Sequence, residues 1–147
     1  MRLRALFVDG VTFLLWAFIC FIYLGIYGFN ILLSSLGVVF GLIFGVAVAL
    51  KYISSLKKKG EIKVTLKTWA YLLLTIIILV SIALYFLFSL GLKAGIQMLS
   101  FLYPFILALY AARIILYLSW ERKNKKHILS DGLVFTRVYA VPESERR

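Results

Sequence analysis

Cysteine, histidine and acidic residues are scarce in this sequence. Its 147 residues include one cysteine, Cys20, one histidine, His127, and six acidic residues. A lone cysteine cannot form an intrachain disulfide. One cysteine with one histidine cannot supply the ligand sets of common zinc sites or a pair of haem-binding histidines. The sequence therefore predicts no metal site and no cofactor.

The residue patterns that catalysis requires are missing as well. The chain has no nucleophile–base pair, no paired carboxylates and no glycine-rich loop of the kind that binds phosphate. We therefore predict that the protein is not an enzyme, and we assign no catalytic residue.

Apolar residues, by contrast, are abundant. They make up 63% of the chain, and charged residues only 16%, whereas a typical soluble domain has about 45–50% and about 25%. Folded in water, such a chain would leave much apolar surface uncovered, and a bilayer would accept that surface. Because the length suits one compact bundle, we predict a single transmembrane domain over residues 1–147.

Four apolar segments are long enough to cross a bilayer, whose core of about 30 Å needs about 20 helical residues. They are residues 11–28, 31–53, 69–92 and 95–119, and the first could begin as early as Ala5. Short turns join the first to the second and the third to the fourth, and residues 120–147 form a tail. We therefore predict an all-α membrane protein, a four-transmembrane-helix bundle made of two antiparallel hairpins.

The basic residues lie on one side of these predicted spans. Of seventeen in total, two precede the first span, six lie in the loop 51–68 and seven in the tail, whereas the turn side has only Lys93. Basic loops stay in the cytoplasm, so we expect both termini and this loop on the cytoplasmic side of the cell membrane. Anionic lipid headgroups are the expected partner. Nucleic acid is not, because no basic stripe is interleaved with aromatic residues that could stack on bases.

Two stretches on this predicted cytoplasmic side have the patterns of β-strands. Residues 61–67 alternate polar and apolar side chains, and residues 134–141 are rich in β-branched and aromatic side chains. We hypothesise that the two stretches pair into a short cytoplasmic β-ribbon.

Small residues recur every four positions in the second predicted span, at Gly37, Gly41 and Gly45. Such residues share one helix face and let another backbone approach closely. This predicted helix-packing face could meet a neighbouring span of the same chain, or it could form a homo-oligomer.

Two ionisable residues interrupt the predicted spans, Asp9 in the first and Arg113 in the fourth. Burying a charge in a bilayer is costly, so each is a functional candidate. Each also has a structural alternative. The Arg113 side chain could extend to the inner headgroups, and Asp9 could cap a helix that begins near Gly10. If the helix begins near Arg4 instead, Asp9 lies inside it and needs Arg4 or Arg113 as a partner.

Other polar residues lie near this predicted inner region. Tyr110 and Tyr117 share a helix face with Arg113, and Pro104, which has no N–H, should kink the fourth span. His127 lies among asparagine and lysine residues, and we expect it to be solvated or to face headgroups.

Both ends of the chain resemble the RDD family, small multi-span membrane proteins named for an arginine and two aspartates. Residues 4–9 (Arg-Ala-Leu-Phe-Val-Asp) resemble the family's opening. Residues 125–138 (Lys-Lys-His-Ile-Leu-Ser-Asp-Gly-Leu-Val-Phe-Thr-Arg-Val) resemble its closing segment. Residues 69–92 lack the further acidic residue that the family often has near its third span. The resemblance implies a role for Arg4, Asp9 and Asp131, and cation/proton exchange is ascribed to some members.

Two functions are therefore predicted. The first is a small-cation or proton transporter, or a transport accessory, of the RDD type. Its predicted ion or substrate pathway consists of Arg4, Asp9, Arg113 and Asp131. The alternative is a non-transporting membrane scaffold or binding subunit, which would use the glycine face of the second span and the basic cytoplasmic loops.

Overall fold

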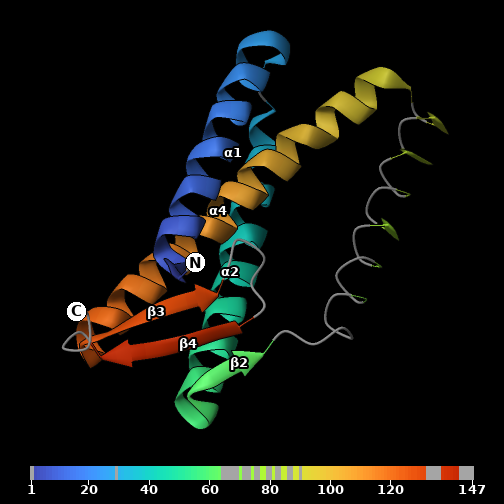
Figure 1. The fold of residues 1–147 in the computed structure, drawn as a ribbon. Helices are drawn as coiled ribbons and strands as arrows, with labels where there is room; N and C mark the ends of the chain where they lie inside the picture. The colour runs from blue at the N-terminus through green and yellow to red at the C-terminus, as the bar shows by residue number, and fades with distance from the viewer. Residues whose placement is uncertain are drawn as a thin grey trace.

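Three long helices and a small β-sheet make up most of the described part of the chain (Figure 1). The computed structural model describes residues 2–28, 30–63, 70, 74, 77, 78, 81, 84, 85, 88, 89, 91–131 and 137–142. The helices are α1 (Ala5–Tyr27), α2 (Ile31–Lys59) and α4 (Leu92–Asn124). The strands are β1 (Arg2–Arg4), β2 (Glu61–Lys63), β3 (Lys126–Asp131) and β4 (Arg137–Pro142).

Each of the three helices is long and apolar enough to cross a membrane. The chain is therefore compatible with a membrane location. The predicted span 69–92 lies mostly outside the described residues, so the four-helix bundle stays a prediction.

The helices extend beyond the predicted spans. Helix α1 begins at Ala5 rather than at residue 11, α2 continues to Lys59 and α4 to Asn124. The chain turns between α1 and α2 at Gly28, whose φ of 80° favours glycine. The Asn30 side chain then caps α2 by accepting from the Leu33 N–H at 3.1 Å.

The glycine face of α2 packs against α4. A Cβ atom placed on Gly41 would lie 2.3 Å from the Phe105 carbonyl oxygen, and one placed on Gly37 would lie equally close to the Phe101 carbonyl oxygen. Gly45 approaches Leu109 in the same way. The three glycines therefore lie where the backbones of α2 and α4 approach each other closely. Because α4 of the same chain occupies the face, it offers no room for a second copy.

Polar contacts join all three helices at the end opposite the sheet. Helix α4 runs through Pro104, whose missing N–H leaves the Ser100 carbonyl without its helical donor. The Ser34 hydroxyl donates to that carbonyl at 2.8 Å. From α1, the Tyr23 hydroxyl donates to the Ile96 carbonyl and lies 3.2 Å from the Ser100 hydroxyl.

The four strands form one antiparallel sheet in the order β1-β3-β4-β2. The hypothesised pairing of 61–67 with 134–141 is confirmed where Glu61, Ile62 and Lys63 pair with Tyr139, Val138 and Arg137. The ribbon is part of a larger sheet, however, because β1 and β3 add two strands that the sequence analysis did not predict. The predicted tail is thus largely structured, with the end of α4 followed by β3 and β4.

The sheet lies where α1 begins and where α2 and α4 end, which we call the sheet end (Figure 1). Its apolar side chains join those of the helices in one core. The buried members of this core are Ala5, Ala49, Ile53, Leu56, Tyr117, Ile128 and Val138. The sheet is therefore packed onto the helices and ties the first strand of the chain to the last.

We predict that Gly41→Ala destabilises the protein by about 3 kcal/mol, the upper range for an overpacked site. The added methyl group would collide with backbone atoms of α4, which cannot move aside as a flexible side chain can. Thermal or chemical unfolding in detergent micelles measures the loss. Gly25→Ala is the matched control, because a Cβ there meets no atom within 4 Å. Equal stability of the two variants would contradict the tight α2–α4 contact.

Candidate functional site

Asp9 and Arg113 form an ion pair between α1 and α4. The Arg113 Nη2 atom lies 3.2 Å from the Asp9 Oδ1 atom, and Asp9 is 1% exposed. Because α1 begins at Ala5, Asp9 lies inside the helix, and the residue at the cap position is Arg4. The interpretation of Asp9 as a helix cap is therefore wrong.

Two tyrosine rings of α4 surround the Arg113 guanidinium. Its Cζ atom lies 5.4 Å from the ring centroid of Tyr110 and 5.6 Å from that of Tyr117. At such distances the ring faces stabilise a cation. The Arg113 side chain is only 17% exposed and is directed toward Asp9. The alternative in which it extends to the lipid headgroups is therefore wrong.

The ion pair leaves polar atoms available on both partners. The Asp9 Oδ2 atom and the Arg113 Nε atom are buried, and neither has a hydrogen-bond partner among the described residues. Buried polar atoms without partners are rare because they cost free energy, and each one needs an explanation. Chemically, the spare carboxylate oxygen can accept a proton or coordinate a small cation.

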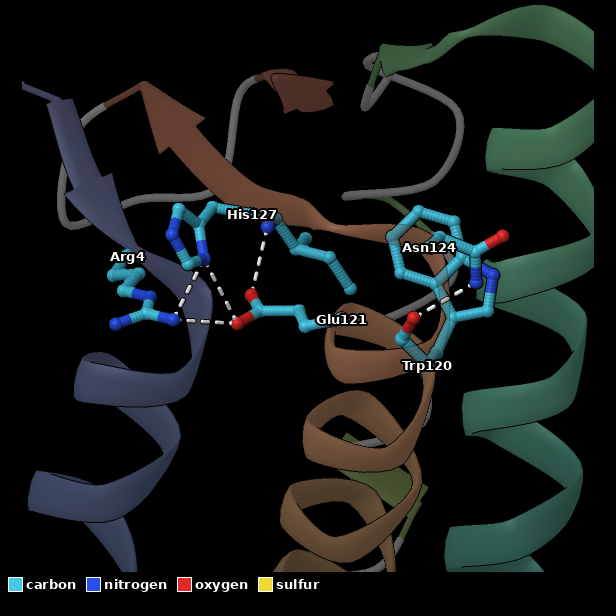
Figure 2. Close-up of polar contacts among 6 residues, drawn as sticks. Arg4, Trp120, Glu121, Asn124 and His127 are labelled. Carbon is cyan, nitrogen blue, oxygen red and sulfur yellow. Dashed lines mark hydrogen bonds and ion pairs between the residues drawn. The ribbon is translucent and has the colours of Figure 1, made fainter. Parts of the chain in front are cut away.

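A second charged cluster lies closer to the sheet, between Arg4, Glu121 and His127 (Figure 2). The Arg4 Nη2 atom is 2.7 Å from Glu121 Oε2 and 2.7 Å from His127 Nδ1. Glu121 is 4% exposed, and its Oε1 atom accepts from the Ile128 N–H at 2.8 Å. Glu121 therefore links the start of α1, the end of α4 and strand β3.

His127 belongs to this cluster and is not solvated as predicted. Its side chain is 14% exposed, and its Nδ1 atom lies between a donor, Arg4, and an acceptor, Glu121 Oε2 at 3.2 Å. A neutral ring with its proton on Nε2 accepts from Arg4, whereas a proton on Nδ1 would be donated to Glu121. The prediction was wrong because Arg4 is 123 positions away in the sequence and the neighbouring residues give no sign of it.

The two clusters form what we call crossed ion pairs: α4 supplies the positive partner of one pair, Arg113, and the negative partner of the other, Glu121. Arg113, Tyr117 and Glu121 follow one another at intervals of four residues, so they share one face of α4. Asp9 meets Arg113, and Arg4 meets Glu121. Helix α4 thus presents one charge of each sign, and so does the start of the chain, with Arg4 just before α1 and Asp9 inside it. Sliding α1 by one turn along α4 would separate the opposite charges, so the pairs fix the register of the two helices.

The structure pairs two of the four residues predicted for the ion pathway, Asp9 and Arg113, whereas Arg4 belongs to the second cluster with Glu121 and His127. The fourth, Asp131, ends β3, where its backbone pairs with Arg2, and its side chain lies outside the described residues. Glu121 was not predicted. Its position eight residues after Arg113, on the same helix face, was the available signal. Among the described residues, no three histidine, cysteine or acidic side chains gather in a way that could hold a metal ion.

One further ion pair lies at the edge of the sheet. Glu61 of β2 accepts hydrogen bonds from the Arg137 side chain of β4, with a 2.7 Å contact to Arg137 Nε, and Lys63 Nζ lies 3.4 Å away. The hydrogen bond from Arg137 lowers the pKa of the Glu61 carboxyl, and Lys63 lowers this pKa further. Glu61 therefore stays charged at a lower pH than an isolated glutamate and remains paired across the β2–β4 edge.

No protein-family model matches this sequence, and no curated protein or solved structure matches it. The resemblance to the RDD family therefore stays a prediction. The geometry of the two charged clusters is the basis of any functional argument.

We predict that Asp9→Asn and Arg113→Gln each lower the free energy of unfolding by about 3–5 kcal/mol, because each leaves its buried partner without a counter-charge. The double variant should lose much less than the sum of the two. Chemical unfolding of all four proteins in detergent measures the coupling. Glu61→Gln, at an exposed pair, is the control and should have a smaller effect. Strictly additive losses would show that the two side chains do not interact.

We also predict that Glu121→Gln loosens β1 and β3, because the amide carries no charge for Arg4 and is a weaker acceptor for the Ile128 N–H. Hydrogen exchange in β1 and β3 should accelerate, while exchange in the α2–α4 contact stays unchanged. Mass spectrometry of peptides from the exchanged protein measures this. Arg122→Gln, an exposed neighbour, is the control. Unchanged exchange in β3 would contradict the linking role of Glu121.

Proposed function

We propose that this chain is a multi-pass membrane protein of the RDD type that transports protons or small cations, or assists a transporter. In this proposal Asp9 is the group that takes up the ion. The observation that carries it is the buried Asp9 carboxylate, which has one oxygen bound to Arg113 and one without a partner among the described residues. Ionisable residues inside membrane helices are rare, and each is a functional candidate by default.

The distribution of charge supports a cytoplasmic position for the sheet end. The last turns of α2 and α4 are basic, and so is the start of the chain. Such segments remain in the cytoplasm. On this topology Asp9 lies near the cytoplasmic mouth of the bundle, and both termini are cytoplasmic.

Arg113 would act as the counter-charge that sets how tightly Asp9 holds an ion. The guanidinium stays protonated at all relevant pH values, so it cannot carry the proton itself. A proton or cation that reaches Asp9 Oδ2 competes with Arg113 for the carboxylate. This competition weakens binding and thereby favours release, which a transporter needs.

A non-transporting scaffold or binding subunit is the second candidate. It is favoured by the charge balance, since both Asp9 and Glu121 already have a cationic partner, and buried pairs often serve only to fix one structure. The glycine face of α2 is occupied by α4. A partner would therefore bind the basic surface at the sheet end.

Ion flux in proteoliposomes distinguishes the two candidates. Purified protein is reconstituted with a pH-sensitive dye inside, and an inward gradient of a monovalent cation is imposed. Transport predicts a cation-dependent pH change that Asp9→Asn reduces to the level of empty liposomes. Glu61→Gln, an acidic residue at the same end of the molecule, should transport normally.

The control for folding is the elution profile of each variant in detergent together with its melting temperature. An Asp9→Glu variant keeps the charge and should retain part of the flux. If the wild-type protein gives no flux above empty liposomes for any cation tested, transport is rejected and the scaffold is retained.

A further inference from the structure

A shallow, open hollow lies on one face of α4 near the sheet end. Its volume is about 590 Å³, and it is lined by Ile115, Leu118, Ser119, Arg122 and Lys123. These positions follow helical spacing and share one face of α4. The face is separate from the crossed ion pairs, because Tyr117 and Glu121 in the same turns are buried on another side.

The lining changes from apolar to basic along the helix axis. Ile115 is 64% exposed and Leu118 is also exposed, and both precede the polar residues Ser119, Arg122 and Lys123. At 1.5 Å per residue, the distance along the axis from Ile115 to Lys123 is about 12 Å. The headgroup layer is about 5–7 Å thick on each side of a bilayer, so this length is enough to reach from the ends of the acyl chains across the headgroup layer.

Among the described residues, the positive charge of the hollow is not compensated by a neighbouring acid. Glu121 is the nearest acidic residue in the sequence, and it is already bound to Arg4 and to the Ile128 N–H. Among the described residues, no carboxylate forms an ion pair with Arg122 or Lys123. A guanidinium, an ammonium and a hydroxyl group together are a donor set suited to phosphate.

We propose that this hollow binds one anionic phospholipid. Its headgroup phosphate would lie on Ser119, Arg122 and Lys123, and an acyl chain would lie along Ile115 and Leu118. The two basic residues also favour the C-terminal end of the α4 dipole. The interaction with the helix dipole alone would account for the two positive charges, but it would not account for the exposed apolar residues Ile115 and Leu118 beside them. The proposal depends on α4 crossing a bilayer and is independent of transport.

Native mass spectrometry with added lipid tests this site. The purified protein in detergent is titrated with phosphatidylglycerol or with phosphatidylcholine. We expect preferential retention of one phosphatidylglycerol molecule. Arg122→Gln/Lys123→Gln should weaken its apparent affinity about thirtyfold, from two basic contacts at the membrane surface. Lys57→Gln/Lys58→Gln is the matched control, because it removes the same charge from exposed lysines at the end of α2. This control should retain the lipid.

Two further measurements show whether the bound phosphate belongs to a lipid or is free inorganic phosphate. Inorganic phosphate at millimolar concentration should not displace the lipid, and Leu118→Asn should weaken lipid binding because the acyl chain loses its apolar contact. Melting temperatures in the absence of lipid confirm that each variant is folded. The proposal is overturned if phosphatidylcholine binds equally well, or if the α2 control loses as much affinity. It is also overturned if free phosphate competes while Leu118→Asn has no effect.

Discussion

The close approach of the α2 and α4 backbones is the contact on which the rest of the structure depends. Gly37, Gly41 and Gly45 have no side chains to hold the helices apart, so α4 lies directly on α2. Its opposite side is then free to face α1, and it carries the residues that meet Asp9 and Tyr23. In a bilayer no hydrophobic effect drives helices together, and such close contact supplies the attraction through van der Waals packing.

A second constraint acts at the sheet end, where ion pairs and strand pairing fix the register of α1 against α4. Apolar contacts between the helices cannot do so. Apolar helix surfaces allow one helix to slide along another with little loss of contact. The crossed pairs Asp9–Arg113 and Arg4–Glu121 permit one register only. Strand β1 leads directly into α1, and β3 follows α4 after one residue, so the β1–β3 pairing reinforces the same register. Ion pairs and sheet thus act on the same two helices.

Much of this fold can be predicted from the sequence, and the remainder depends on contacts between distant residues. Hydropathy identifies α1, α2 and α4 because a bilayer requires long apolar runs. It misplaces their ends, since Lys57–Lys59 and Arg122–Asn124 continue the helices beyond the apolar region. The β2–β4 pairing could be predicted from the alternation of polar and apolar side chains in residues 61–67 and from the β-branched residues in 134–141. Strand β1 is too short to show any period, and the link from His127 to Arg4 has no local signal. Asp9 and Arg113 could be named as partners because each is a charge in an apolar segment.

The aromatic rings beside Arg113 bear on whether Asp9 is a structural or a functional residue. If Asp9 alone stabilised the Arg113 cation, neutralising the carboxylate would leave a buried cation without a stabilising partner. Asp9 and Arg113 would then have to stay in contact. Tyr110 and Tyr117 place their rings near the guanidinium, so part of its stabilisation does not depend on Asp9. This lowers the cost of separating the pair when an ion binds Asp9. Uptake of an ion by Asp9 would require such a second support for the guanidinium, and the two rings supply one.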